Sequence, residues 1–147
     1  VTGGATRSES VRAGLAIVPD SADIVVVHDA ARPLAPVALF HAVMAAVRVG
    51  ADGAVPALPV VDTLKQVEGD RVAATVERHG LVAVQTPQAF RADALRAAHA
   101  AGGGSTDDAA LVEAAGGKVV TVPGDPLNLK ITTPHDLAWA AWVMREL

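Results

Sequence analysis

The chain has 147 residues with a net charge of -4 at pH 7, and 51% of the residues are hydrophobic. A chain of this length forms one domain, residues 1–147, with a sizeable core, and its lack of cysteine excludes disulfides, Fe–S clusters and thiolate zinc sites and fits a cytoplasmic location. The negative charge argues against a broad nucleic-acid footprint, and no stretch is long and apolar enough to predict a bilayer span.

The predicted elements alternate between helix and strand. Thr6 and Glu9 form a capping box in front of a helix that we predict over about residues 7–18. Residues 24–28 follow as a strand, and because its first four positions are all apolar we expect it to be covered on both faces in a parallel sheet. A second helix is predicted from near Pro36 to Gly50.

The middle of the chain predicts a hairpin. Ala54 opens an apolar segment in which Pro56 and Pro59 prevent an ordinary interior strand throughout. Residues 61–78 then form two β-patterned runs around a turn signal at residues 68–70. A two-stranded ribbon is marginal in water, so we expect this segment, called the arm below, to lie on its own domain or on another copy of the chain. The arm therefore indicates dimerisation.

The rest of the chain continues the alternation. The predicted elements are a strand ending at Val84, a helix over about residues 91–100, a helix capped by Ser105 or Thr106 and ended by Gly116, short strands over residues 118–122 and 127–131, and a last helix from Pro134. This order predicts an α/β fold, a sheet with flanking helices.

The first strand ends at a pair of charged residues. Asp29 and Arg32 follow it directly, where the loops of open α/β sheets bind ligands. Asp29 can hold a hard divalent cation, and Arg32 can clamp a phosphate or carboxylate through two nitrogens. The structural alternative is that Asp29 only ends the strand and Arg32 only pairs with it.

Other polar side chains also follow apolar runs or open helices. These candidate site residues are Thr63, Arg78, Thr86, Thr106 and Lys130. Lys130 lies inside an apolar segment, so it either points into solvent or meets an anion. Thr86 and Thr106 equally fit caps of turns or helices. We interpret His28 as a structural hydrogen-bonding residue, and His99 as a solvated residue on a helix.

Six segments, in order, resemble the 2-C-methyl-D-erythritol 4-phosphate cytidylyltransferase family over essentially the whole chain. They are Gly3-Gly4-Ala5-Thr6-Arg7-Ser8-Glu9-Ser10-Val11, His28-Asp29-Ala30-Ala31-Arg32-Pro33, Asp62-Thr63-Leu64-Lys65, Gln85-Thr86-Pro87-Gln88-Ala89-Phe90, Thr106-Asp107-Asp108 and Leu129-Lys130-Ile131-Thr132-Thr133-Pro134-His135-Asp136-Leu137. The resemblance implies a Rossmann-like nucleotidyltransferase sheet and a homodimeric enzyme of the non-mevalonate isoprenoid pathway. Such an enzyme joins CTP to methylerythritol phosphate, uses Mg²⁺ and releases diphosphate, and its β-arm reaches over the partner's site.

The resemblance also implies residue roles. Gly4 and Ser10 match contacts to the cytosine end of the nucleotide, and Asp29 matches the carboxylate near the metal and the substrate hydroxyls. The matches to the sugar-phosphate pocket are Arg32, Thr86, Thr106 and Lys130. Thr63 and Arg78 match arm residues that enter the partner's pocket. Arg78 and Lys130 match the two cations that hold the attacking phosphate.

The chain departs from the family at its beginning. The family's glycine-rich loop, with the arginine and lysine that stabilise the transition state, precedes the first matched segment, so we expect these 147 residues alone to be inactive towards CTP. Ala5 replaces a polar residue found in some relatives. The alternatives are a ribitol 5-phosphate cytidylyltransferase, a non-catalytic binding or dimerisation module, and a domain fused to the next enzyme of the pathway.

Overall fold

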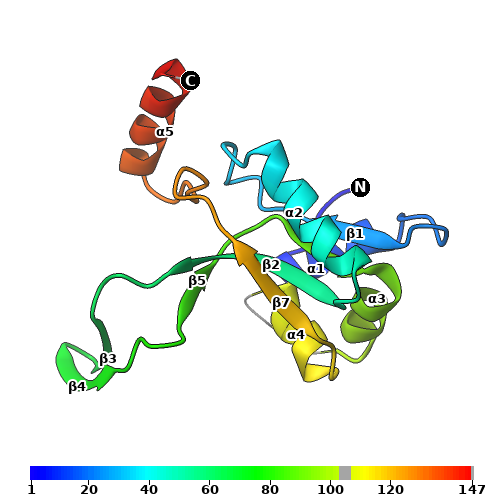
Figure 1. Ribbon diagram of the computed structural model, residues 1–147, viewed down its shortest axis with the longest axis horizontal. Coiled ribbons are helices and arrows are strands. Elements are labelled where there is room, and N and C mark those ends of the chain that lie inside the picture. Colours follow the sequence, from blue (N-terminus) through cyan, green and yellow to red (C-terminus); the bar gives the residue numbers. More distant parts are fainter. Residues whose placement is uncertain (103–106, 147) are drawn as a thin grey trace.

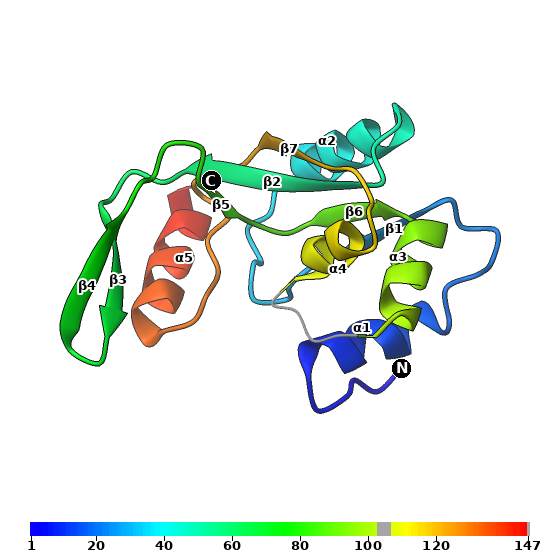
Figure 2. The same ribbon diagram turned by 90° about the horizontal axis from the view of Figure 1, so that it is seen from below.

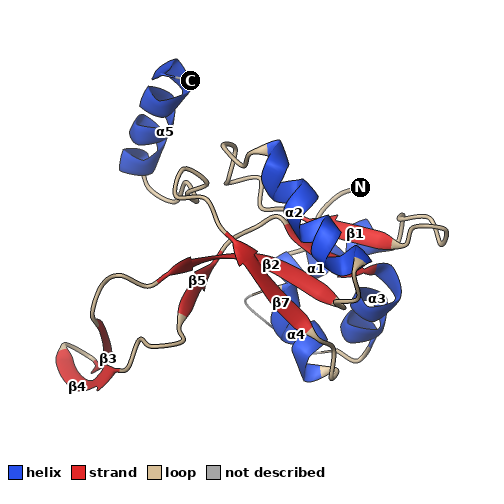
Figure 3. Cartoon of the chain, in the orientation of Figure 1, coloured by secondary structure: helices blue, strands red, loops and turns tan. Residues whose placement is uncertain are grey.

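The computed structural model describes residues 1–102 and 107–146. Its elements are α1 (Arg7–Leu15), β1 (Ile24–Val27), α2 (Val37–Arg48), β2 (Gly53–Pro59), β3 (Leu64–Glu68), β4 (Arg71–Val76), β5 (Val82–Val84), β6 (Gln88–Arg91), α3 (Ala92–Ala100), α4 (Asp108–Ala114), β7 (Val119–Pro123) and α5 (Pro134–Glu146). Helices flank a central sheet, which confirms the predicted α/β class (Figures 1 and 3). No helix in the described part of the chain is both long and apolar enough to cross a membrane.

The sheet is mixed rather than parallel. Its strands run in the order β1-β6-β2-β5, and β7 also pairs with β2. Only the β2–β7 pair is parallel among the described strand pairs, and β1 pairs antiparallel with β6, with Ile24 opposite Arg91. We expected β1 to lie in a parallel sheet, and this expectation is wrong for its described partner, β6. Strand β6 has only four residues and runs directly into α3. Its run of alternating residues is too short to indicate a strand in the sequence.

Apolar side chains pack against both faces of β1. Val25 and Val27 pack against a core cluster that includes Phe90 and Leu95, and the alternate residues of β1 pack against a second cluster formed with α2. Figure 2 shows α2 on one side of the sheet and α1, α3 and α4 on the other. The prediction that both faces of this strand are covered is confirmed.

Pro56 marks a change of partner along β2. The strand pairs with β6 at Gly53 and Ala54 and with β5 from Ala57 onward, while its other edge pairs with β7. The carbonyl of Pro56 accepts a hydrogen bond from the Gln85 amide at 2.8 Å. The segment is thus a continuous strand, but the pairing on one edge changes near the proline, which cannot donate to a ladder.

The arm forms the predicted hairpin. Strands β3 and β4 make a separate two-stranded sheet, with Leu64 opposite Val76 and a bulge between Gln66 and Val67. Every residue of β4 is exposed. Figures 1 and 2 both show the arm projecting from the end of the sheet opposite α1 and α3. In the described part of the chain, the strands of the arm are therefore exposed except at Leu64.

Three predicted local features differ in the structure. Helix α1 ends at Leu15, and the N-cap of α4 is Asp107, whose carboxylate accepts from the Ala110 amide at 3.0 Å. Residues 127–131 form no strand. Their apolar pattern resembles a strand, but Asn128 is fully buried and its side-chain amide donates to the Thr86 carbonyl at 2.9 Å. Side-chain bonds to the backbone replace a strand ladder here.

Candidate active site

Asp29 lies at the centre of the candidate site, in the loop that follows β1. Its Oδ2 is 3.0 Å from Lys130 Nζ, and its Oδ1 is 3.4 Å from Arg7 Nε. Partial burial raises the pKa of the Asp29 carboxyl, but Lys130 and then Arg7 outweigh that effect, and the pKa lies below its usual value of 3.8. Asp29 is therefore ionised at neutral pH, between two cations.

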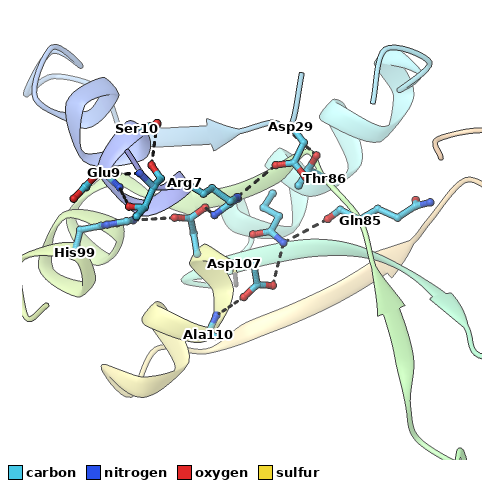
Figure 4. A network of polar contacts seen from close by, with 12 residues as sticks. Arg7, Glu9, Ser10, Asp29, Gln85, Thr86, His99, Asp107 and Ala110 are labelled. Carbon is cyan, nitrogen blue, oxygen red and sulfur yellow. Dashed lines mark hydrogen bonds and ion pairs between the residues drawn. The ribbon is translucent and has the colours of Figure 1, made fainter. Parts of the chain in front are cut away.

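Thr86 positions the backbone of Asp29. Its hydroxyl oxygen accepts from the Asp29 amide at 3.0 Å (Figure 4) and is 3.1 Å from His28 Nδ1. His28 Nε2 is 3.1 Å from the Arg32 carbonyl, which can only accept, so Nε2 carries the hydrogen and Nδ1 accepts from the Thr86 hydroxyl. The interpretation of His28 as a structural hydrogen-bonding residue is confirmed. In this chain Thr86 is buried and its hydroxyl is used structurally.

Arg32 does not form an ion pair or hydrogen bond with Asp29 among the described contacts. Its Nη1 donates instead to the Asn128 carbonyl at 2.8 Å, which ties the loop after β1 to the segment that carries Lys130. Burial lowers the pKa of the Arg32 guanidinium, and the nearby Asp29 charge opposes that shift. The alternative in which Arg32 merely pairs with Asp29 is wrong, since Lys130 and Arg7 occupy that place.

A buried amide network fixes the segment that carries Lys130. The side chain of Gln85 donates to the Asp125 carbonyl at 2.9 Å and accepts from the Asp125 amide at 3.1 Å. The Ile131 amide donates to the Ala31 carbonyl at 2.8 Å. Together with Asn128, these contacts hold residues 125–131 beside the loop after β1, so that Lys130 faces Asp29. Sequence reasoning missed Gln85 and Asn128, because a buried amide has no spacing signature.

Gly4 and Ser10 lie together at the start of α1. The Gly4 amide donates to Ser10 Oγ at 3.1 Å, and Ser10 Oγ donates to the Thr6 carbonyl at 3.0 Å. A Cβ on Gly4 would lie 2.2 Å from the Cβ of Glu9, so a larger residue is excluded there. The predicted capping box of Thr6 and Glu9 is present. The structure thus brings Gly4 and Ser10 into contact, while their contact to a nucleotide stays a prediction.

Ser10 and Asp29 face the same cleft. This hollow, about 490 Å³ in volume, lies between α1 and β1, and its polar lining includes Arg7, Ser10, His28 and Asp29. A second hollow of about 420 Å³ includes Arg91 and Asp93, which pair with each other, and contains none of the predicted site residues. The α1–β1 cleft is therefore the better candidate for a substrate site.

The arm residues lie apart from this cleft. Arg78 Nη1 donates to the carbonyls of Val60 and Val61 at the base of the arm, and Arg78 and Thr63 line the same exposed hollow. Among the described residues, no hydrogen bond or ion pair joins Arg78 to Asp29 or Lys130. One chain therefore brings Asp29 and Lys130 together but not Arg78. Thr106 lies outside the described residues.

Sequence reasoning also overlooked Arg7 and placed His99 wrongly. The expectation that His99 is solvated is wrong, because its side chain is buried and Nε2 lies 2.9 Å from Asp108 Oδ1. Arg7 carries no signal in the sequence, since a charged residue in the first turn of a helix looks solvated. Its Nη1 is 2.8 Å from Asp108 Oδ2, an ion pair that joins α1 to α4. Packing of the helices, rather than spacing along the chain, produces both contacts.

Asp136 anchors α5 beside the segment that carries Lys130. Its carboxylate accepts from the Thr132 and Thr133 amides at 3.0 and 2.8 Å and from the Thr132 hydroxyl at 3.0 Å. These hydrogen bonds, those of the Thr132 and Thr133 backbone first, lower the pKa of Asp136 to about 2.

We therefore expect a carboxyl NMR titration to give a midpoint near pH 2 for Asp136. Because the folded pKa is below 3.8, the stabilisation is fully present above pH 3.8 and is lost as the pH falls through about 2. Asp136→Asn identifies the resonance and should remove that part of the pH dependence of unfolding. A midpoint at the unperturbed value would contradict this cap.

A sheet with helices on both faces, and an ionised carboxylate held between cations at the end of a strand, place the chain among α/β proteins with a candidate site at a strand end. The model of the family 2-C-methyl-D-erythritol 4-phosphate cytidylyltransferase matches residues 1–146. The chain belongs to this family, which confirms the resemblance seen in the sequence.

Relatives of known sequence and structure agree. The chain is 57% identical over 141 residues to the 2-C-methyl-D-erythritol 4-phosphate cytidylyltransferase of Nocardia farcinica, covering 95% of this chain and 61% of that protein. It is 55% identical over 139 residues to the bifunctional enzyme IspD/IspF of Clavibacter michiganensis, covering 93% of this chain and 34% of that protein. The crystal structure of the cytidylyltransferase from Thermus thermophilus matches with a TM-score of 0.90 at 42% identity, over 99% of this chain and 72% of that one.

Proposed function

We propose that the protein containing this chain transfers a cytidylyl group from CTP to 2-C-methyl-D-erythritol 4-phosphate in the cytoplasm. The products are 4-diphosphocytidyl-2-C-methyl-D-erythritol and diphosphate, a step of the non-mevalonate isoprenoid pathway. The observation that carries the proposal is the Asp29–Lys130 pair at the α1–β1 cleft, in a chain of this family. Ribitol 5-phosphate is the weaker acceptor candidate, since the relatives described above are named for methylerythritol phosphate or for the bifunctional enzyme.

The reaction is an in-line displacement at phosphorus. A phosphate oxygen of methylerythritol phosphate attacks the α-phosphorus of CTP, the bond to the β-phosphate oxygen breaks, and diphosphate leaves with that electron pair. Both reactants are anionic, so cations must hold them in contact. Lys130 supplies a point charge, and its side chain is 46% exposed, so a phosphate can reach it. When it binds the attacking phosphate, it releases Oδ2 of Asp29.

Mg²⁺ fits the site with Asp29 as its protein ligand. Magnesium is commonly bound by one or two carboxylates together with substrate phosphates, and Asp29 is ionised and lies at the edge of the cleft. Bound there, the ion would neutralise charge on the phosphate groups. Lys130 must move from Oδ2 for that oxygen to become available, which couples phosphate binding by Lys130 to metal binding by Asp29.

A homodimer would complete the site. The arm carries Arg78 and Thr63 but lies away from Asp29 and Lys130 of its own chain (Figure 1). Its strands also expose Val67, Val72 and Val76, and an uncovered two-stranded ribbon is marginal in water. A second copy of the chain that packs on the arm would bury these valines and receive Arg78 next to its own Lys130.

The test is an assay for acceptor-dependent diphosphate release. The encoded protein that contains this chain is incubated with CTP, Mg²⁺ and methylerythritol phosphate, and phosphorus NMR follows the diphosphate and the new diester. We expect turnover with methylerythritol phosphate and little with ribitol 5-phosphate. Absence of methylerythritol-dependent diphosphate release would reject the proposed function, and equal use of ribitol 5-phosphate would reject the assigned acceptor.

A thermal-shift titration examines the 147-residue chain separately from turnover. A ligand at about 100 times its Kd stabilises the folded state by about 2.7 kcal/mol. We expect methylerythritol phosphate to raise the melting temperature and ribitol 5-phosphate to leave it unchanged. A non-catalytic dimerisation module would respond to neither ligand.

A further inference from the structure

A continuous series of charged and polar side chains runs from the protein interior to Asp29. It begins at His99 on α3, passes through Asp108 on α4 and Arg7 on α1, and reaches Asp29 and then Lys130. The successive distances are 2.9 Å from His99 Nε2 to Asp108 Oδ1, 2.8 Å from Asp108 Oδ2 to Arg7 Nη1, 3.4 Å from Arg7 Nε to Asp29 Oδ1, and 3.0 Å from Asp29 Oδ2 to Lys130 Nζ. The proposed reaction uses only the last two of these residues.

The interior end of this series is buried. The side chains of Asp108 and His99 are 0% and 4% exposed. A carboxylate can only accept, so His99 Nε2 donates its hydrogen to Asp108. Asp108 also opens α4, where the helix dipole favours a negative charge. The position of Asp108 is thus determined by α3 and α4.

Arg7 connects Asp108 to Asp29 in the candidate site. One guanidinium contacts Asp108 through Nη1 and Asp29 through Nε, and its side chain is 29% exposed. The 2.8 Å contact to Asp108 is an ion pair without regular hydrogen-bond geometry, so charge rather than bond direction joins these two groups, whereas Nε donates a hydrogen bond to Asp29. The planar fork of arginine can meet two carboxylates at once, whereas the single ammonium of lysine cannot match both directions. A fixed cation on Oδ1 leaves Oδ2 as the oxygen that Lys130 can release. The contact between Arg7 and Asp108 therefore determines which oxygen of Asp29 becomes available when Lys130 moves away.

We infer that Arg7 is a positioning residue for Asp29, and that the buried pair of Asp108 and His99 holds Arg7 in place. The inference rests on the proposed function, since it concerns the carboxylate that this function uses. Without the charge of Asp108, Asp29 alone would compensate Arg7 and would be shared more strongly between two cations. Its oxygens would then be less available to a metal and a substrate.

The test compares two variants with a control in the encoded protein. Asp108→Asn keeps the shape of the side chain and removes its charge, and Arg7→Lys keeps a charge but removes the fork. Arg12→Lys, an exposed position of the same helix, is the matched control. Rates are measured at temperatures where circular dichroism shows each variant folded, with titrations of Mg²⁺ and of each substrate.

We expect Asp108→Asn and Arg7→Lys each to lower kcat by about 10- to 100-fold and to raise the Mg²⁺ concentration that gives half the maximal rate, as for partners that orient metal ligands. The double variant should be about as slow as the slower single variant, because both changes interrupt one connection. Arg12→Lys should match the unaltered protein.

A purely structural role gives a different result. It would lower the melting temperature of Asp108→Asn but leave the kcat and Mg²⁺ dependence of the folded variant unchanged, and that outcome overturns the inference. Losses that multiply in the double variant overturn it as well. If Asp108→Asn does not fold, Arg7→Lys decides alone by the same criteria. An unaltered protein without cytidylyl transfer would instead reject the proposed function.

Discussion

Arg78→Ala is expected to lower kcat/KM for methylerythritol phosphate by about 10²- to 10³-fold, the effect of removing one charge-stabilising donor, and to leave the KM for CTP nearly unchanged. Arginine has five N–H donors, so Arg78 can keep its contacts to the carbonyls of Val60 and Val61 and still hold a phosphate. Steady-state kinetics with each substrate varied in turn measures the two parameters. Arg71→Ala, another exposed arginine of the arm, is the matched control and should have little effect.

An equal loss for CTP and for methylerythritol phosphate would remove the role assigned to Arg78. A mixing experiment then asks whether the arm acts on its partner. Dimers of Arg78→Ala subunits and dimers of Lys130→Ala subunits should each be strongly impaired, but a mixed dimer contains one site with both cations. After random exchange, about half of the dimers are mixed and each has one intact site, so about a quarter of the activity should return. No recovery, with exchange verified by sedimentation or mass spectrometry, contradicts the shared site.

Asp29→Asn should lower kcat by about 10²- to 10³-fold, because it removes the only carboxylate that contacts Lys130 among the described residues. The fold should survive. Arg7 keeps its ion pair with Asp108, Lys130 is 46% exposed to water, and the Asp29 backbone amide still donates to Thr86. The expected loss of stability is therefore small, about 1 kcal/mol, because water screens the half-exposed Lys130 partner of the partly buried Asp29.

Kinetics and urea unfolding test both parts of this prediction, with the exposed Asp20→Asn as the control carboxylate. A variant that loses stability in proportion to activity would make Asp29 a structural residue. The lowered pKa of Asp29 also predicts how the stability depends on pH. The stabilisation by ionised Asp29 is present above pH 3.8 and is lost as the pH falls through the lower pKa of the folded state. The rate should accordingly show no titration of Asp29 near neutral pH, and a dependence there would contradict the assignment.

Local patterns in the sequence predicted the features that neighbouring residues determine. The capping box of Thr6 and Glu9 starts α1, the turn at residues 68–70 separates the two strands of the arm, and the apolar run of β1 ends at Asp29. Each depends on residues a few positions apart, whose spacing carries the information. The same local reading failed for residues 127–131, where a buried amide at Asn128 binds the backbone of a distant segment.

The amino-acid order alone thus determined the α/β class, the arm, the family and a list of polar residues that includes Asp29 and Lys130. Only the tertiary structure decided that Lys130 and Arg7 share Asp29, that Arg32 does not pair with it, and that Asp108 and His99 are buried behind Arg7. These contacts join residues up to 101 positions apart, from Asp29 to Lys130, with no periodic pattern between them. The physical reason is that ion pairs and buried hydrogen bonds depend on three-dimensional distance and desolvation, which arise only when the elements pack.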